Sequence, residues 1–167
     1  MKKILLLIPM LLGVFLCACQ TVPEEKISKL ETYYLKAPQG GNVFFEKYSD
    51  TQSCYAAAEE AVKSNLSELG YKQAESEKDA QFIVAPRYYP ETFEYPDPFA
   101  RKIGEPSSAN FGTALNLSIR VTTPSGQFLF SGDTRYKLIR ENLNKASIAR
   151  QVKWALEYFP PRAEAQK

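Results

Sequence analysis

The clearest pattern along the chain is an alternation of apolar and polar residues near its C-terminal third. From Leu115 to Thr122 every second residue is apolar and the residues between them are polar, which is typical of a strand with one buried face. Pro124-Ser125-Gly126 then supplies turn residues, and Phe128 and Phe130 resume the alternation. The pattern predicts a β-hairpin.

Two other segments carry apolar residues at spacings of three and four, which predicts two amphipathic helices. The first should begin at Ser49-Asp50-Thr51-Gln52, which matches a capping box, and end at Gly70. The second should run from about Ala146 to Phe159, where Pro160-Pro161 stops it. Each helix offers one apolar face to a sheet.

Three further segments are predicted to be strands. Leu30 to Lys36 and Val43 to Tyr48 are aromatic and β-branched and lie on either side of Pro38-Gln39-Gly40-Gly41. Ala80 to Ala85 is a nearly continuous apolar run, as expected of a strand covered on both faces, and Pro86 should end or kink it. The strands before and after the first helix should be parallel neighbours joined by a right-handed crossover.

Residues 86–112 are predicted to form a long loop, because they hold Pro90, Pro96, Pro98 and Pro106 and show neither helical nor strand periodicity. Residues 162–167 have little apolar content and are expected to be a frayed tail. The order of elements therefore predicts an α+β fold for a single domain at 29–161. Its mixed sheet should have four to five strands, with two helices packed on one face.

The N-terminus carries a different signal. Lys2 and Lys3 precede an uninterrupted apolar run of 13 residues from Ile4 to Leu16, which is a signal-peptide pattern. As a helix this run measures about 20 Å, too short for a hydrocarbon core of about 30 Å. A transmembrane helix is therefore the less favoured interpretation.

Leu16-Cys17-Ala18-Cys19 resembles the lipobox of bacterial lipoproteins. The resemblance implies a signal peptide at 1–18, lipid on Cys19 and a short tether at 19–28. An ordinary secretory signal with chance cysteines is the alternative. Gln20 stands where an aspartate would favour inner-membrane retention, so we expect the periplasmic face of the outer membrane, with the outer face of the cytoplasmic membrane as the alternative.

Charge and cysteine content narrow the possible partners. Removing residues 1–18 takes away two lysines and no acid, so the formal charge falls from +2 to 0. Basic residues are scattered among the acids, so nucleic-acid binding is not expected. Cys54 is then the only cysteine besides Cys19, and we expect it to be a small buried thiol, with an intermolecular disulfide as the alternative.

Two resemblances follow from the order of motifs. Four segments match the pattern of an uncharacterised family of bacterial lipoproteins built on a domain of unknown function: Leu66 to Tyr71, Asp79 to Val84, Ser125 to Gly132, and Phe159-Pro160-Pro161. Tyr34 to Val84 is similar to the N-terminal part of surface-exclusion lipoproteins, but their glycine-rich membrane hairpin is missing here. Neither resemblance implies a catalytic residue.

The residue types present argue against most enzymes. The chain has no histidine, which excludes histidine-dependent nucleophiles, general bases and metal sites, and it has no phosphate-binding glycine loop. No cofactor or metal is expected. Acids and aromatic residues gather in the predicted loop: Glu91, Glu94 and Asp97 beside Tyr88, Tyr89, Phe93, Tyr95 and Phe99.

This cluster allows three interpretations. The aromatic residues could form a partner-binding surface, or they could fold back over the open face of the sheet. The carboxylates could instead serve an enzyme acting on cell-wall glycan, which requires two of them held about 5 to 9 Å apart. Trp154 and Tyr158 are explained by packing beside the last helix, and Asp133 and Arg135 are expected to be solvated charges.

The sequence therefore favours a membrane-anchored envelope lipoprotein that is not an enzyme. Its expected partners are the membrane, through the lipid, and either another envelope protein or a second copy of the chain. The carboxylate enzyme is the alternative function.

Overall fold

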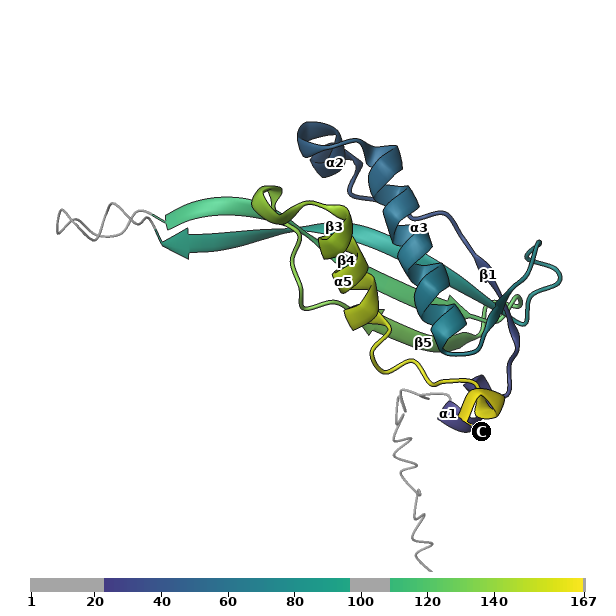
Figure 1. Cartoon of the computed structure of the whole chain (residues 1–167). Coiled ribbons are helices and arrows are strands. Elements are labelled where there is room, and N and C mark those ends of the chain that lie inside the picture. Colours follow the sequence, from purple (N-terminus) through teal and green to yellow (C-terminus); the bar gives the residue numbers. More distant parts are fainter. Residues whose placement is uncertain (1–22, 97–108, 167) are drawn as a thin grey trace, which may run out of the picture.

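The computed structural model describes residues 23–96 and 109–166, which form an α+β fold with a five-stranded mixed sheet. Helices α3 and α5 lie side by side on the same face of the sheet (Figure 1), so the predicted fold class is confirmed. The elements are α1 (Glu24–Ile27), β1 (Thr32–Leu35), α2 (Asn42–Tyr48), α3 (Thr51–Glu68), β2 (Lys72–Gln73), β3 (Phe82–Pro96), β4 (Ala109–Thr122), β5 (Phe128–Asp133), η1 (Arg140–Asn142), α5 (Lys145–Ala155) and η2 (Ala163–Gln166).

The strand order in the sheet is β2-β1-β3-β4-β5. Strand β1 pairs in parallel with β2 and β3, whereas β4 pairs antiparallel with both β3 and β5. The strands before and after helix α3 are thus parallel neighbours, as predicted. The strand before it is β1, whereas the sequence predicts Val43 to Tyr48. The predicted hairpin is β4 and β5.

The segment Val43 to Tyr48 is helix α2, so its prediction as a strand was wrong. Gly40 and Gly41 both have positive φ, 78° and 76°, which ends the extended chain just before it. A Cβ on Gly40 would lie 2.1 Å from the carbonyl oxygen of Tyr88. The helix buries Phe44 and Phe45, and β-propensity yields to this packing.

Helix α3 confirms the first predicted helix and shows which residue caps it. The Ser53 backbone N–H donates to the Asp50 carboxylate at 2.8 Å, so Asp50 is the cap and the helix starts at Thr51. Cys54 is buried on the face of α3 that meets the sheet, and burial raises the pKa of its thiol. The expected buried thiol is confirmed.

The predicted loop is wrong at 86–96 and 109–112, which belong to strands β3 and β4, while its residues 97–108 lie outside the described residues. Strand β3 pairs with β4 without interruption from Ile83 opposite Thr122 to Pro96 opposite Ala109. The Lys36 N–H donates to the Val84 carbonyl at 2.9 Å and the Tyr88 N–H to the Gln39 carbonyl at 2.7 Å. Backbone groups of even-numbered β3 residues therefore point towards β1, and those of odd-numbered residues point towards β4.

The prolines of β3 are Pro86, Pro90 and Pro96, all at even positions. The N–H group that each proline lacks would point away from β4. The ladder between β3 and β4 consequently loses no hydrogen bond, and a segment that looks like a loop by composition is a long strand.

The two ends of the described chain pack together against the same side of the domain. Ile27, which belongs to the predicted tether at 19–28, is buried in the domain. The Ala163 N–H donates to the Ser28 carbonyl at 2.9 Å. The Tyr71 hydroxyl donates to the Pro160 carbonyl at 2.8 Å, and burial raises the pKa of Tyr71 to about 12. The tail is therefore bound at its start, where a frayed segment was expected.

Candidate functional site

Strands β3 and β4 extend beyond the rest of the sheet as a two-stranded projection (Figure 1). Strand β1 pairs with β3 only up to Val84, and β5 pairs with β4 only from Ser118 onward. Residues 91–96 and 109–114, called the arm below, pair with each other and with no other described strand. The arm therefore presents surface on both of its faces.

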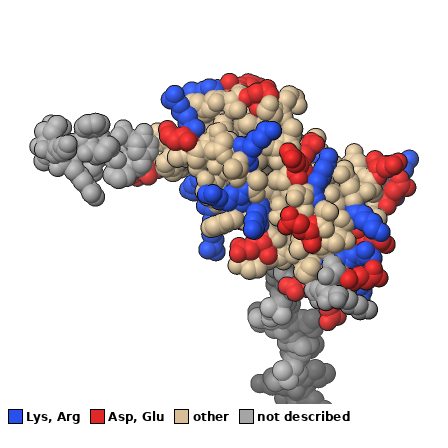
Figure 2. Space-filling view, in the orientation of Figure 1, with Lys and Arg blue, Asp and Glu red and all other residues tan. Residues whose placement is uncertain are grey.

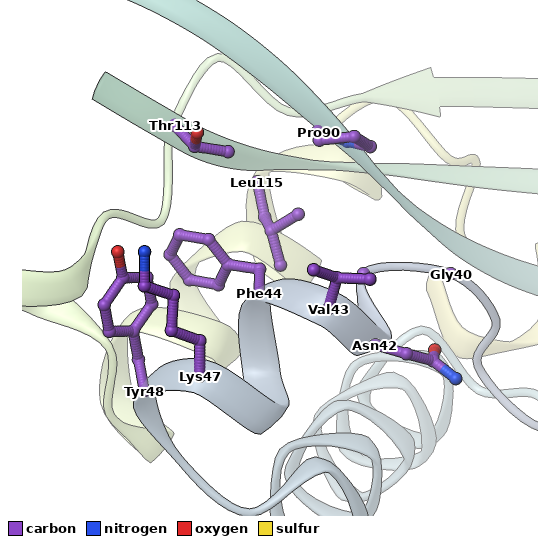
Figure 3. A pocket seen from close by; sticks show the side chains of 10 residues that line it. Gly40, Asn42, Val43, Phe44, Lys47, Tyr48, Pro90, Thr113 and Leu115 are labelled. Atoms are coloured by element: carbon purple, nitrogen blue, oxygen red, sulfur yellow. The ribbon is translucent and has the colours of Figure 1, made fainter. Parts of the chain in front are cut away.

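A groove lies between helix α2 and the base of the arm (Figure 3). It consists of two hollows of about 750 and 610 Å³, which share Lys47, Tyr48 and Thr113 in their walls. We call this combined hollow the arm groove. Its other lining residues include Val43, Phe44, Pro90 and Leu115 in the first hollow and Phe93, Phe111, Ile139 and Arg140 in the second.

The walls of the arm groove expose large apolar side chains. Val43 is 84% exposed on α2 and Phe111 is 69% exposed on the arm, while Phe44 is buried beneath them. Tyr48 carries two cations at its ring, since Lys47 Nζ lies 5.1 Å and Arg140 Cζ 5.7 Å from its centroid. The second hollow also holds Glu141, so the groove combines apolar walls with a part that carries two cations and one acid.

The structure separates the aromatic residues that the sequence groups together. Tyr88 is buried on the helix side of the sheet, where its ring meets Phe45 edge-on at 5.1 Å, and burial raises the pKa of Tyr88. Tyr89 is half-buried on the opposite face, and Phe93 lines the arm groove. The side chain of Tyr95, all of Phe99 and Cys19 lie outside the described residues.

The buried hydroxyl of Tyr88 has no hydrogen-bond partner among residues 23–96 and 109–166. We expect Tyr88→Phe to leave the free energy of unfolding unchanged or raise it by about 1 kcal/mol, because it removes an unpaired polar group. Tyr71→Phe is the matched control and should lower it by about 1 kcal/mol through loss of the bond to Pro160. Urea denaturation of both variants is the measurement, and equal destabilisation would show that Tyr88 has a partner.

Of the three candidate carboxylates, the structure describes Glu91 and Glu94. Glu91 and Glu94 are three positions apart on β3 and therefore lie on opposite faces. Glu91 accepts a hydrogen bond from Lys137 Nζ at 2.7 Å and another from Asn116, and these bonds hold the pKa of its carboxyl below its usual value. A general acid of a glycosidase requires a raised pKa. Asp97 lies outside the described residues.

Other predicted positions are placed as follows. Trp154 and Tyr158 are 45% and 79% exposed, so packing does not account for them. Trp154 follows Val152, which faces the core, by two residues, and a helix turns this position outward. Asp133 and Arg135 are exposed as expected. In residues 23–96 and 109–166 no three metal-binding side chains cluster.

The composition of Val43 to Tyr48 predicts a strand, and a strand there would not form the walls of the arm groove. A usable signal was present in the spacing of Phe44, Phe45 and Tyr48, which share one side of a helix but not of a strand. The charged Glu46 and Lys47 between them are exposed, as that spacing requires.

Fold and site together define a small α+β domain with a projecting arm and an apolar groove at its base. No protein-family model and no curated protein matches the chain. Among solved structures, it is similar to the PelC dodecamer from Paraburkholderia phytofirmans, with 12% identity over 81% of this chain and 90% of that chain and a TM-score of 0.47. A single-substitution variant of that dodecamer gives 11% identity over 81% and 91%, with a TM-score of 0.45. The proposals below rest on this chain's own residues.

Proposed function

We propose that this chain is a cell-envelope lipoprotein, held to a membrane by lipid on Cys19, whose domain binds a partner protein through the arm groove. The observation that carries the proposal is the presence of two exposed apolar side chains in the arm groove, Val43 of α2 in its first hollow and Phe111 of the arm in its second. Exposed apolar residues that share one concave surface are a mark of interaction sites. The domain acts by binding and has no catalytic role.

The sequence before the described domain supports the anchor. The apolar run from Ile4 to Leu16 leads directly into the lipobox-like Leu16-Cys17-Ala18-Cys19. Among the described residues, no helix has the length and apolar content needed to cross a bilayer. Two or three acyl chains on Cys19 would hold the domain stably at the periplasmic face of the outer membrane.

The lining of the arm groove indicates what the partner offers. Phe44 and Leu115 form an apolar floor, which fits leucine-like or aromatic side chains. Lys47 and Arg140 lie beside Tyr48 in the part of the groove nearest the arm, which fits an acidic group. We therefore expect a protein segment that combines apolar anchors with a carboxylate, and an envelope protein other than this chain is the proposed source.

The anchor is tested by fatty-acid labelling of wild type and Cys19→Ala in growing cells. Wild type should incorporate the label and fractionate with membranes, whereas Cys19→Ala should lose the label and leave the membrane fraction. An unlabelled wild-type chain would contradict the anchor.

The groove is tested by photocrosslinking in intact cells from positions Val43 and Phe111, with Glu60 on the exposed side of α3 as the control position. Both groove positions should capture the same protein and Glu60 should not. Phe44 and Leu115 are left unchanged in this experiment, because both are buried and their replacement would destabilise the fold. Capture of this chain itself would identify self-association, and equal capture from Glu60 would contradict the proposal.

A further inference from the structure

A second hollow, of about 600 Å³, lies on the sheet face turned away from α3 and α5. Small side chains form part of its floor. In one row of the sheet, Arg120 of β4 pairs with Ala85 of β3 on one side and with Ser131 of β5 on the other. Ser118 stands opposite Arg87 in the neighbouring row. Long side chains surround these small ones, namely Lys36, Arg87 and Arg120.

The pairing register fixes which face these residues occupy. Antiparallel partners share a face, and alternate residues of one strand point to opposite faces. Val84 and Tyr88 of β3 are buried on the helix side, so Ala85 and Arg87 point the other way. Pro90 and Leu115 line the arm groove on the helix side of the sheet, whereas Ala85 and Arg87 line the hollow on the other side. The sheet therefore separates the two sites.

The lining of the hollow includes three basic residues, Lys36, Arg87 and Arg120, and no acid among the described residues. Lys36 pairs with Glu77 at 3.3 Å. Within the described residues, Arg87 and Arg120 have no ion-pair partner, and Arg120 lies 5.8 Å from the centroid of the Phe128 ring. Their positions are diagonal neighbours on adjacent strands, where like charges repel.

The acids on this face do not offset that charge. Glu91 is occupied by Lys137 and Asn116. Asp133 lies in the same row as Arg87 but two strands away, about 10 Å, and it is a diagonal neighbour of Arg120 on the adjacent strand. In the described part of the chain it forms no ion pair with either arginine. The two guanidinium groups therefore face an open hollow with their donors available.

The remaining lining is polar and suits a hydroxyl-rich ligand. The side chains of Ser118 and Ser131 make no hydrogen bond to the described part of the chain, and Gln39 adds an amide at the edge. A volume of about 600 Å³ is in the range of sites for small organic molecules, about 300 to 1,000 Å³. It is far larger than a single small anion needs.

We propose that this hollow binds an anionic saccharide, a sugar that carries a phosphate or a carboxylate. The guanidinium groups of Arg87 and Arg120 hold the oxyanion, because their planar donor arrays match phosphate and carboxylate oxygens. The two serine hydroxyls meet the hydroxyls of the sugar ring. This site goes beyond the proposed function and does not depend on the arm groove.

Calorimetric titration of the mature full-length chain in detergent tests the site with four probes: glucose 1-phosphate, trigalacturonic acid, glucose and inorganic phosphate. One or both of the first two should bind, the one that binds identifying the source of the oxyanion, and each should bind more tightly than glucose or phosphate. Raising NaCl from about 50 to about 300 mM should weaken the binding. Equal binding of inorganic phosphate, or no binding of either anionic sugar, would overturn the proposal.

Variants locate the binding. Arg87→Gln and Arg120→Gln should each weaken it at least about tenfold. Arg150→Gln is the matched control, because Arg150, like Arg120, lies over an aromatic ring, at 5.1 Å from the Tyr136 centroid, but on α5. It should leave binding unchanged, and an equal loss there would overturn the proposal.

Ser118→Phe adds a test that removes no charge, because it fills the floor of the hollow. It should abolish binding of the anionic sugars while thermal unfolding and crosslinking from Val43 and Phe111 stay at wild-type levels. Unchanged binding in a folded Ser118→Phe chain would place the ligand elsewhere and contradict the site. Retained crosslinking separates failure of this site from failure of the arm groove.

Discussion

Replacing Gly132 with alanine is expected to lower the free energy of unfolding by about 3 kcal/mol. Gly132 lies on β5, where a Cβ would stand 1.7 Å from the carbonyl oxygen of Ala155 at the end of α5. The two nearest atoms, the oxygen and the carbon of the Ala155 carbonyl at 1.7 and 2.8 Å, are backbone, so no side-chain rotation relieves the overlap. The helix must move away from the sheet, which opens the contacts of Val152 and Leu156 with the core.

Chemical denaturation of Gly132→Ala measures this effect, with Ser131→Ala as the control. Ser131 is adjacent on β5 but exposed on the opposite face, so its replacement should change the free energy of unfolding by less than about 0.5 kcal/mol. Wild-type stability of Gly132→Ala would contradict the close seating of α5 on β5.

The second large effect is expected at Gln151, which is completely buried on α5. Its Nε2 donates to the carbonyl oxygens of Leu115 at 2.9 Å and Tyr136 at 2.7 Å. The amide thereby joins the helix to β4 and to the segment after β5. Gln151→Leu keeps about the size of the side chain but removes both hydrogen bonds, which should cost about 2 kcal/mol. Each carbonyl keeps one other donor, the Leu138 N–H at 3.0 Å for Leu115 and the Thr134 hydroxyl at 3.4 Å for Tyr136.

Gln151→Glu gives a stricter form of this test. An ionised carboxylate cannot donate to either carbonyl, so at neutral pH this variant should lose about 3 to 5 kcal/mol. Burial would raise the folded-state pKa of the new carboxyl, so the deficit should shrink as the pH falls towards the unfolded value of about 4.3. Gln52→Leu, an exposed position on α3, is the control and should stay within about 0.5 kcal/mol of wild type. A Gln151→Leu chain as stable as wild type would contradict the two hydrogen bonds.

The parts of the fold that the sequence predicts correctly have a strong local period. The alternation from Leu115 to Thr122 gives the strand, and the three-and-four spacing between Cys54 and Leu66 gives helix α3. Both signals arise within one element, so no knowledge of its neighbours is needed. The α+β class follows from their order along the chain.

The errors occur where a neighbouring segment decides the outcome. Pro86 and Pro90 look like the ends of strands, and only the position of β4 reveals that their missing N–H groups are not needed. The aromatic residues of α2 look like a strand, and only the buried space beside Tyr88 explains the helix. Tyr88 and Tyr89 look like one surface, yet adjacent strand positions face opposite ways.

The sequence does not predict the arm groove or the hollow at Ala85, because both depend on neighbouring segments. The arm groove needs α2, the arm and η1 to meet, although they come from three distant stretches of the chain. The hollow at Ala85 needs small residues of three strands to stand in adjacent rows, which depends on register. The sequence offers five aromatic residues as a binding surface, and the structure describes the side chains of three of them: Tyr88, Tyr89 and Phe93. Of these three, only Phe93 lines the arm groove.

The packing of Ile27 beside the C-terminal segment sets the orientation of an anchored molecule. Under the proposed attachment at Cys19, Pro23 follows four residues later, and four extended residues span at most about 14 Å. This short tether would keep Pro23 within about 14 Å of the lipidated cysteine. Helix α1 and the C-terminal end would face the lipid, and the arm, which projects from the other end of the molecule (Figure 1), would reach away from it. On the helix-bearing side, basic and acidic side chains are interspersed (Figure 2), so that side offers anionic lipid no uniform attraction that would tip the arm back onto the membrane.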